Sequence, residues 1–148
     1  MRLVVIGGVA AGTKAASRAR RVDPDLEITI YQEEPEISQS ECGLPYLLSG
    51  IVEHRDDLIA RTPEEFAEKD VEVLTRHRVE RIDSDQKKLG VRNLSTDEEF
   101  EDSYDRLIIA TGAKAALPPL AEGADLGGVF TLRFLTDADK ILSYIEER

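Results

Sequence analysis

The chain has 148 residues, the length of one ordinary domain, and its 41% apolar and 33% charged residues are typical of a folded protein. Thirty acidic residues outnumber nineteen lysines and arginines, and the formal net charge of −11 disfavours sequence-independent binding to nucleic acid or to an anionic membrane. The single cysteine excludes a disulfide framework within the chain, and with only two histidines a Cys/His zinc site is nearly excluded.

The chain also lacks the patterns that direct proteins to membranes or to export. No apolar run approaches the ~20 residues that span a bilayer. Met1 leads directly into an apolar run, without a cationic region or a cleavage site. We therefore expect no membrane span, no secretory signal and a cytoplasmic location.

The first third of the chain predicts a βαβ unit. Leu3 to Ile6 is a continuous apolar run, typical of a strand that is buried on both faces of a parallel sheet. After Gly7-Gly8 we expect a helix from Ala10 to Arg21, followed by a β-branched strand from Glu27 to Tyr31. Such a unit pairs its two strands in parallel through a right-handed crossover.

The middle of the chain is more broken. Residues Gln32 to Glu41 are polar and predict a loop, and Cys42 to Ser49 is expected to start a short helix that breaks near Gly50. Thr62-Pro63-Glu64-Glu65 is a strong helix start, with Thr62 as the N-cap and Glu65 at N3, and that helix is expected to run to about Lys69.

The remaining expected elements are mostly strands, with an irregular stretch from Leu117 to Gly128 and a terminal helix from Thr136 to Glu146, capped by Thr136 with Asp139 at N3. The strands are Val71–Leu74, Val79–Ile82, Lys88–Asn93, Glu99–Glu101, the buried Tyr104–Ala110 and Val129–Leu132. The expected fold class is therefore α/β, with a parallel central sheet and an additional small antiparallel segment.

A glycine-rich turn joins the first strand to the first helix. The sequence Gly7-Gly8-Val9-Ala10-Ala11-Gly12 follows the strand–turn–helix pattern of dinucleotide-binding domains, with Val9 at the second glycine position of G-x-G-x-x-G. The helix start offers unpaired N–H groups and a partial positive charge to a pyrophosphate. The alternative is a glycine turn in an α/β domain that binds no nucleotide.

The end of the second strand is where such domains place an acid for the ribose hydroxyls. Gln32 stands at that position and Glu33 follows it. Gln32 can donate or accept a hydrogen bond but binds a hydroxyl more weakly than a carboxylate does. Glu33 is a candidate ribose ligand, and the alternative is a solvated acidic loop.

The only cysteine lies in Ser38-Gln39-Ser40-Glu41-Cys42-Gly43-Leu44-Pro45-Tyr46, just before an expected helix. A helix dipole at that place favours the thiolate, which is the nucleophilic form. The alternative is a buried and inert cysteine.

Taken together, these motifs resemble the N-terminal part of the single-cysteine flavoprotein disulfide reductases, and most closely the coenzyme A-disulfide reductases. The resemblance covers essentially the whole chain. It is carried by four stretches, Val4–Ala16, Ser38–Tyr46, Tyr104–Ala113 and Gly128–Asp137.

The resemblance implies a Rossmann-like FAD-binding domain of the glutathione-reductase type. In that family the first turn binds FAD, and Tyr-Asp-x-Leu-Ile-Ile-Ala-Thr-Gly is a second FAD fingerprint, here ending in Ala110, Thr111 and Gly112. Cys42 would be the redox residue, cycling between a thiolate and a mixed disulfide with coenzyme A. Two-cysteine relatives carry Cys-x4-Cys, but position 47 is Leu47.

The resemblance also implies a substrate. Pro45-Tyr46 favours a disulfide, persulfide or coenzyme A-thiol substrate, because relatives that reduce oxygen or peroxide usually lack this pair. Ser38 matches a serine of the cysteine motif, and Arg18 and Arg21 match positions that approach the coenzyme A phosphates. For the two arginines, the alternative is a favourable basic helix end. Glu41 departs from the family, which commonly has a neutral residue there, and its charge would oppose the thiolate.

Complete members of the family are much longer, so the chain is expected to be the first segment of a discontinuous FAD domain. The NAD(P)H domain, the second FAD segment and the dimerisation domain would lie outside it, and the parent protein would be a homodimer. Two rival functions stay open. One is an NADH oxidase or peroxidase that works through a Cys42 sulfenic acid, and the other is a non-catalytic nucleotide-binding module.

Overall fold

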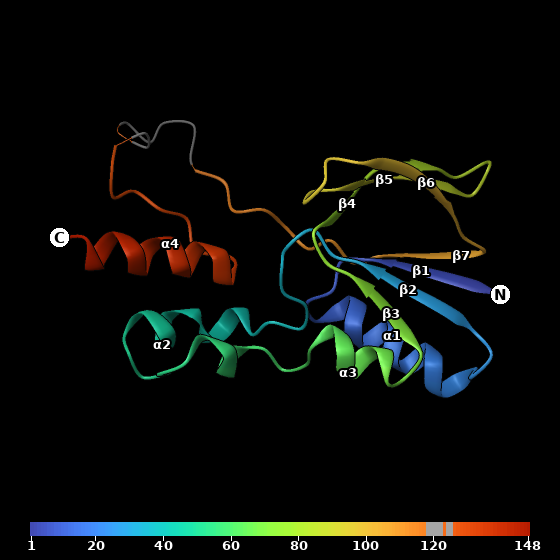
Figure 1. The fold of residues 1–148 in the computed structure, drawn as a ribbon, viewed down its shortest axis with the longest axis horizontal. Coiled ribbons are helices and arrows are strands. Elements are labelled where there is room, and N and C mark those ends of the chain that lie inside the picture. Colours follow the sequence, from blue (N-terminus) through green and yellow to red (C-terminus); the bar gives the residue numbers. More distant parts are fainter. Residues whose placement is uncertain (118–122, 124–125) are drawn as a thin grey trace. The chain divides into compact units, whose positions relative to one another are not determined.

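The computed structural model describes residues 1–117, 123 and 126–148 (Figure 1). Four strands form a parallel sheet in the order β3-β2-β1-β7, with every neighbouring pair parallel. The strands are β1 (Arg2–Ile6), β2 (Glu27–Tyr31), β3 (Val71–Leu74) and β7 (Arg106–Ile109). The expected βαβ unit is confirmed, because β1 pairs with β2 in parallel through the helix α1 (Ala11–Val22).

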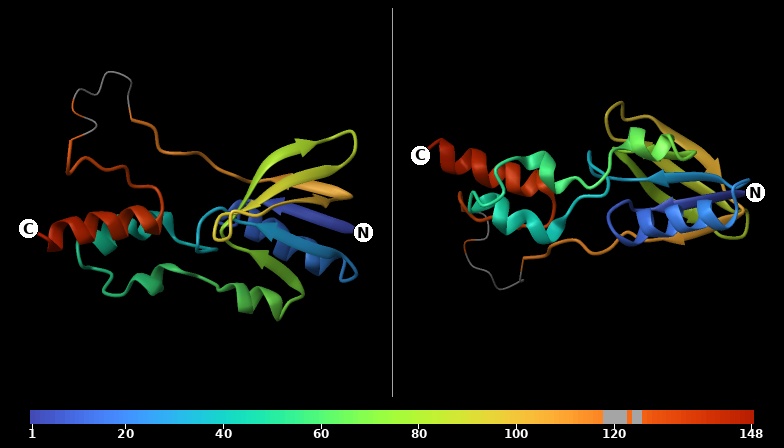
Figure 2. Two further views of the ribbon diagram at one scale, coloured as in Figure 1. Left: turned by 45° about the horizontal axis from the view of Figure 1, so that its top comes forward. Right: turned by 90° about the horizontal axis from the view of Figure 1, so that it is seen from below.

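Both faces of the parallel sheet are covered by other elements. Alternate side chains of a strand point to opposite faces, so each strand contributes to two apolar clusters. On one face Leu3 and Val5 of β1 pack with Ala16 of α1 and with Phe66 of the short helix α3 (Pro63–Ala67). Both helices lie on this side of the sheet (Figure 2). Because both faces are covered, the central strands β1 and β2 are buried at nearly every residue.

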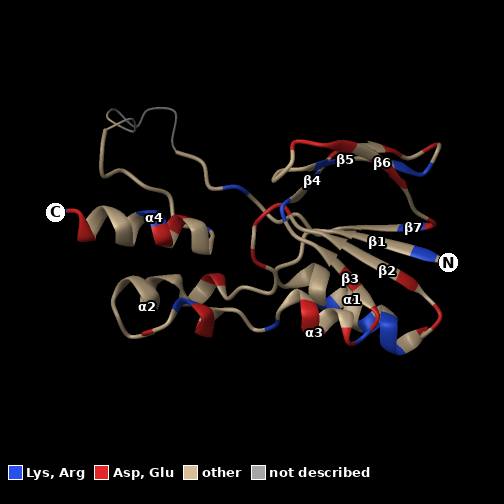
Figure 3. Cartoon of the chain, in the orientation of Figure 1, with Lys and Arg blue, Asp and Glu red and all other residues tan. Residues whose placement is uncertain are grey.

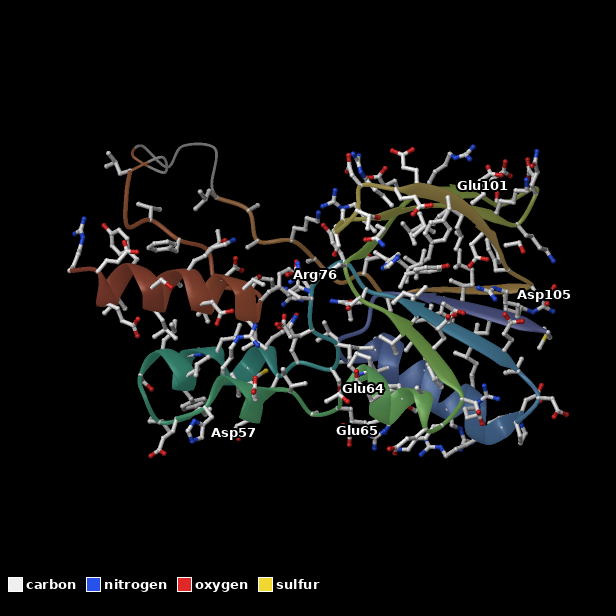
Figure 4. All side chains as sticks on the ribbon, viewed as in Figure 1. Asp57, Glu64, Glu65, Arg76, Glu101 and Asp105 are labelled. Atoms are coloured by element: carbon white, nitrogen blue, oxygen red, sulfur yellow. The ribbon has the colours of Figure 1, made fainter. Side chains whose placement is uncertain are left out.

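A separate antiparallel sheet covers the other face, with β4 (His77–Asp83), β5 (Lys88–Asn93) and β6 (Glu99–Ser103) in that order. Here Val4 and Ile6 of β1 pack against Leu89 and Val91 of β5. Acidic and basic residues are interspersed over this sheet (Figure 3). They include Glu101, labelled in Figure 4, whose carboxylate pairs with both Arg81 and Lys88. The expected α/β class with an additional antiparallel segment is confirmed.

The chain divides into two units, which we describe separately. The first comprises residues Met1–Ser38 and Arg61–Gly112 and holds both sheets, whereas the second comprises Gln39–Ala60 and Ala113–Arg148. The second unit has its own apolar core, formed by Leu44, Leu47, Leu58, Leu135 and Ala138. Its elements are the 3-10 helices η1 (Glu41–Gly43) and η2 (Arg55–Leu58) and the helices α2 (Leu44–Leu48) and α4 (Leu135–Glu146).

The expected helix start at Thr62 is confirmed. The Thr62 hydroxyl accepts a hydrogen bond from the Glu65 N–H at 3.4 Å, and the Glu65 carboxylate accepts one from the Thr62 N–H at 2.9 Å. The helix itself ends at Ala67, two residues before the expected end at Lys69.

Three expectations for the second half of the chain are wrong. The stretch 104–110 is expected to be a buried strand, but β7 lies at one edge of the parallel sheet, where within the described residues only β1 pairs with it, and Ile109 is 62% exposed. Residues 129–132 form no strand. The expected irregular stretch from Leu117 to Gly128 lies largely outside the described residues.

The third error concerns the start of α4. The helix begins at Leu135, with Phe134 as its N-cap, so Thr136 lies inside the first turn. Asp137 takes the N3 position instead of Asp139, and its carboxylate accepts hydrogen bonds from the N–H groups of Arg133 and Phe134. Asp139 is thereby free to pair with Arg55, with a distance of 2.9 Å from Nε to Oδ1.

Among the described residues, no helix combines the length and the apolar character that a membrane crossing requires. Within the same ranges, no group of three or more His, Cys, Asp or Glu side chains is arranged to hold a metal ion.

Candidate functional site

The glycine turn after β1 permits very close backbone contacts. Gly7 has a φ of +99°, and a Cβ at this residue would lie 2.3 Å from the carbonyl oxygen of Ala110. A Cβ at Gly12 would lie 1.8 Å from the carbonyl oxygen of Gly7. Neither position has room for a side chain, so both glycines are needed for strand, turn and helix to meet. Val9 needs no left-handed backbone, which is why a valine fits at the second glycine position.

Gln32, which follows the end of β2, stabilises this turn through a hydrogen bond. Its side-chain oxygen accepts a hydrogen bond from the Gly8 N–H at 2.7 Å, and the residue is only 4% exposed. The backbone of Gln32 is fixed as well, because its N–H donates to Leu74 and its carbonyl accepts from His77, both at 2.9 Å. The structure therefore gives Gln32 a role in shaping the turn, whereas the predicted contact with a ribose stays a prediction.

The start of α1 is open to an anion. Ala10, the N-cap, offers no side-chain cap, and the first turn contains no acid. Among the described residues, the backbone N–H groups of Ala11, Gly12 and Thr13 have no acceptor. Free N–H groups at the start of a twelve-residue helix, after a turn that begins with two glycines, suit a diphosphate. The residues present therefore fit the dinucleotide that the motif predicts.

The second predicted cofactor segment lies beside this turn. Ala110 donates its N–H to the carbonyl of Ile6 at 2.7 Å, and its own carbonyl oxygen occupies the space that a Cβ at Gly7 would need. Thr111 and Gly112 follow as exposed residues, and Gly112 has a φ of +66°. The structure thus brings together two predicted segments that are a hundred residues apart in the sequence.

The predicted acidic ligand and the two predicted basic ligands have different surroundings. The Glu33 carboxylate pairs with the Arg78 guanidinium at 2.8 Å, so this candidate ribose ligand is engaged by the antiparallel sheet. Arg18 and Arg21 are exposed on α1 and make no ion pair among the described residues. Arg20, between them, donates instead to the carbonyls of Pro24 and Asp70.

Ser38, the last residue of the stretch Met1–Ser38 in the first unit, has an unusual backbone conformation. Its φ is +57°, a value that non-glycine residues adopt at a cost, and its N–H donates to the carbonyl of Gly8 at 2.7 Å. This predicted substrate residue is therefore attached directly to the glycine turn.

Cys42 lies at the centre of the 3-10 helix η1 in the second unit, and it is exposed. The expected position just before a helix is confirmed, since α2 begins at Leu44. The turn packs tightly on η2, because a Cβ at Gly43 would lie 2.3 Å from a methyl group of Leu58. The Ser40 N–H also donates to the Leu58 carbonyl at 2.7 Å. The thiol therefore sits on a fixed and accessible turn.

Two residues beside Cys42 connect to the start of α4. The Glu41 carboxylate pairs with the Arg133 guanidinium at 2.8 Å, and the side-chain oxygen of Gln39 accepts a hydrogen bond from the Leu135 N–H at 3.0 Å. Sequence reasoning missed both Arg133 and Gln39. The charge of Glu41 next to the thiol signalled that a cation was needed, but only the tertiary structure identifies which of the nineteen it is.

Known proteins resemble this chain over nearly its whole length. The family model of the pyridine nucleotide-disulphide oxidoreductases matches residues 1–147. A protein named NADH oxidase from Methanocaldococcus jannaschii is 42% identical over 149 residues, which is 99% of this chain and 33% of the relative. A coenzyme A disulfide reductase from Staphylococcus haemolyticus is 41% identical over 147 residues, which is 99% of this chain and 32% of the relative.

A solved structure of an NAD-dependent persulfide reductase from A. fulgidus is similar with a TM-score of 0.91 and 44% identity, over 99% of this chain and 27% of that one. The chain spans about a third of the length of the curated relatives that it matches. Both the family model and the identities cover the glycine turn, the cysteine motif and the second fingerprint. The chain therefore belongs to the pyridine nucleotide-disulphide oxidoreductase family.

Proposed function

We propose that this chain is the FAD-binding and redox-cysteine segment of an NAD(P)H-dependent flavoprotein disulfide reductase. The substrate is coenzyme A disulfide or a related coenzyme A persulfide or small disulfide. The proposal rests on one observation. This chain, a member of the family, contains both a glycine turn that suits a diphosphate and a single, exposed cysteine.

The glycine turn is assigned to FAD. The turn Gly7-Gly8-Val9-Ala10-Ala11-Gly12 would hold its diphosphate, with the N–H groups of Ala11 and Gly12 as donors. The N–H groups of Gly7 and Gly8 donate to Tyr31 and Gln32 instead and fix the shape of the turn. Ala110, Thr111 and Gly112 border the same turn and would contact the nucleotide. Glu33 is the ribose ligand of this proposal, and its ion pair with Arg78 orients the carboxylate.

Cys42 carries out the exchange with substrate. Its thiolate attacks one sulfur of the substrate disulfide, a bond forms between Cys42 and that sulfur, and the other half leaves as a thiolate. When bound, FAD supplies the two electrons, taken from NAD(P)H, that return the mixed disulfide to the Cys42 thiolate and a second thiol. An exposed sulfur on a fixed turn is accessible to a disulfide of this size.

Three residues are assigned to the coenzyme A part of the substrate. Arg18 and Arg21 make no ion pair with any residue that the structure describes, on an otherwise acidic protein, and guanidinium groups bind phosphate in a bidentate manner. Ser38 presents a hydroxyl from the strained turn beside Gly8. The relative named coenzyme A disulfide reductase supports this substrate class.

The decisive variant is Cys42→Ser in the full-length protein, assayed for NAD(P)H-dependent release of thiol from coenzyme A disulfide. We expect turnover to be lost and bound flavin, measured by its visible absorption, to be retained. Ser95→Ala, in the exposed turn between β5 and β6, is the control and should keep both. Retained turnover in Cys42→Ser would reject the assignment.

A second candidate is an NADH oxidase or peroxidase that works through a Cys42 sulfenic acid. The relative from Methanocaldococcus jannaschii that carries the name NADH oxidase favours it. Oxygen consumption and coenzyme A disulfide reduction, measured on the same preparation, separate the two. A rate of oxygen consumption far above the rate of disulfide reduction would favour the oxidase.

We also propose that the chain is the first segment of a discontinuous FAD domain. The NAD(P)H domain, the second FAD segment and the dimerisation domain of a homodimer would lie outside residues 1–148. The relatives' greater length and the open edge of β7, where Ile109 is exposed, support this division.

A further inference from the structure

We infer that Arg133 is a positioning residue for Cys42 that acts through Glu41. Its guanidinium compensates the carboxylate that stands next to the thiol, so that Cys42 reacts as readily as if that neighbour were neutral. The inference rests on the proposed function and adds a residue to it that the cysteine motif does not contain.

The need for compensation follows from the sequence around the thiol. Glu41 and Cys42 are neighbours in the same 3-10 helix, η1. A negative charge on the residue next to Cys42 disfavours a second negative charge on the sulfur and repels the phosphates of a coenzyme A substrate. An uncompensated Glu41 would therefore slow both formation and use of the thiolate.

Arg133 provides the opposite charge. Its Nη1 lies 2.8 Å from Oε2 of Glu41, and the two side chains are only 35% and 21% exposed. A half-buried pair interacts more strongly than a pair in open solvent, because less water screens it. The guanidinium also lies over the Phe134 ring, 5.7 Å from its centre, which restricts where it can move.

The backbone on both sides of the pair is fixed independently. The Asp137 carboxylate accepts the backbone N–H of Arg133 at 3.0 Å and so holds the backbone of Arg133 at the start of α4. Gln39, two residues before Glu41, accepts the Leu135 N–H at 3.0 Å. The other acid at this end of α4, Asp139, is paired with Arg55. Glu41 and Arg133 therefore meet through a scaffold that does not depend on their own attraction.

A charge cycle tests the inference in the chain of residues 1–148, where Cys42 is the only cysteine and reports alone. The variants are Glu41→Gln, Arg133→Gln and the double variant. The measurement is the rate at which neutral iodoacetamide alkylates the thiol at pH 7. Because one unit of charge on or beside the residue next to the thiol is changed, we expect Arg133→Gln to be about 3–10-fold slower and Glu41→Gln about 3–10-fold faster. The double variant should return to within about twofold of the wild type.

Two further variants separate charge from structure. Arg133→Lys keeps the positive charge and should keep the wild-type rate. Arg55→Gln breaks the other ion pair to α4 without changing a neighbour of Cys42, and it should leave the alkylation rate unchanged. Circular dichroism and urea unfolding of each variant establish that the compared chains are folded.

The inference would be overturned if Glu41→Gln and Arg133→Gln changed the rate in the same direction, or if Arg55→Gln slowed it as much as Arg133→Gln. Either result would make the pair a structural contact only. Failure of the proposed function has a different signature. Disulfide turnover by Cys42→Ser in the full-length protein would reject that function, whereas the alkylation cycle needs no flavin and no turnover.

Discussion

Gln32 shows how one buried amide shapes a binding turn. Its side chain accepts the N–H of Gly8 inside the protein, where a donor without a partner is costly. The same residue ends β2, so the hydrogen bond connects the second strand to the turn that follows the first. A glutamine at this position therefore contributes to the turn whether or not it also contacts a ligand.

At the residue scale we predict that Gln32→Met destabilises the fold. Methionine has a similar volume but no strong acceptor, so the Gly8 N–H would be left buried and unpaired. The expected loss is about 1–3 kcal/mol in the free energy of unfolding, measured by urea denaturation. Gln86→Met, on an exposed turn, is the control and should change little. Equal stabilities of the two variants would contradict this role.

At the scale of elements, α3 depends on its cap. The helix spans only Pro63–Ala67, and isolated helices of that length are unstable, so the capping box and the burial of Phe66 must hold it. Figure 4 labels Glu64 and Glu65 in its first turn. The helix in turn covers the end of the parallel sheet at β3.

We expect Thr62→Ala to cost about 1 kcal/mol in the free energy of unfolding, the usual value of an N-cap. Denaturant unfolding provides the measurement. Thr96→Ala, in the exposed turn between β5 and β6, is the matched control. If both substitutions had the same small effect, the cap would not be stabilising α3.

A cluster of polar side chains forms hydrogen bonds between the two sheets of the first unit. The Asp102 carboxylate on β6 accepts hydrogen bonds from the Tyr31 hydroxyl at 2.7 Å and from the Arg2 guanidinium at 2.8 Å. Burial acts to raise the pKa of Asp102, but these hydrogen bonds outweigh it and the pKa is lowered. Burial and the hydrogen bond to Asp102 together raise the pKa of Tyr31 well above its ordinary range.

This cluster makes stability depend on pH in a defined direction. Because the pKa of Asp102 is lower in the folded than in the unfolded state, its stabilisation is complete above about pH 4 and is lost as the pH falls through the lowered pKa. Asp102→Asn should therefore be about 1–3 kcal/mol less stable than the wild type at neutral pH, with the difference shrinking below pH 4. Thermal unfolding between pH 2 and 7 gives the measurement.

Glu98→Gln removes an exposed carboxylate in the turn between β5 and β6 and serves as the control for Asp102→Asn. A stability difference for Asp102→Asn that stayed constant down to pH 2 would show that the charge of Asp102 is not what stabilises the cluster.

At the scale of the whole molecule, the chain holds two units with separate apolar cores and spans about a third of its relatives. The predicted cofactor turn lies in the first unit and the predicted redox cysteine in the second. The proposed reaction needs both, together with a source of hydride that our proposal assigns to sequence beyond residue 148.

We therefore expect the 148-residue chain alone to show no NAD(P)H-dependent release of thiol from coenzyme A disulfide, while the full-length protein does. A thiol assay with added FAD compares the two at equal concentration. Detectable turnover by the chain alone would contradict the proposed division of the enzyme.

The sequence by itself determined the parallel βαβ unit, the antiparallel segment, the cap of α3 and the family. These features depend on local patterns: apolar runs in strands, glycines at a tight turn, and Thr and Glu three positions apart. Their physical causes act within a few residues, so they can be read along the chain.

Only the tertiary structure decided that the Gly8 N–H donates to Gln32, that Glu33 pairs with Arg78, and that Arg133 pairs with Glu41. It also placed the N-cap of α4 at Phe134 instead of Thr136, with Asp137 at N3, and left Ile109 exposed. Each of these depends on which distant segment arrives beside a residue. Since several acids, amides and cations along this chain are chemically equivalent, their partners are chosen by packing, and no local pattern specifies them.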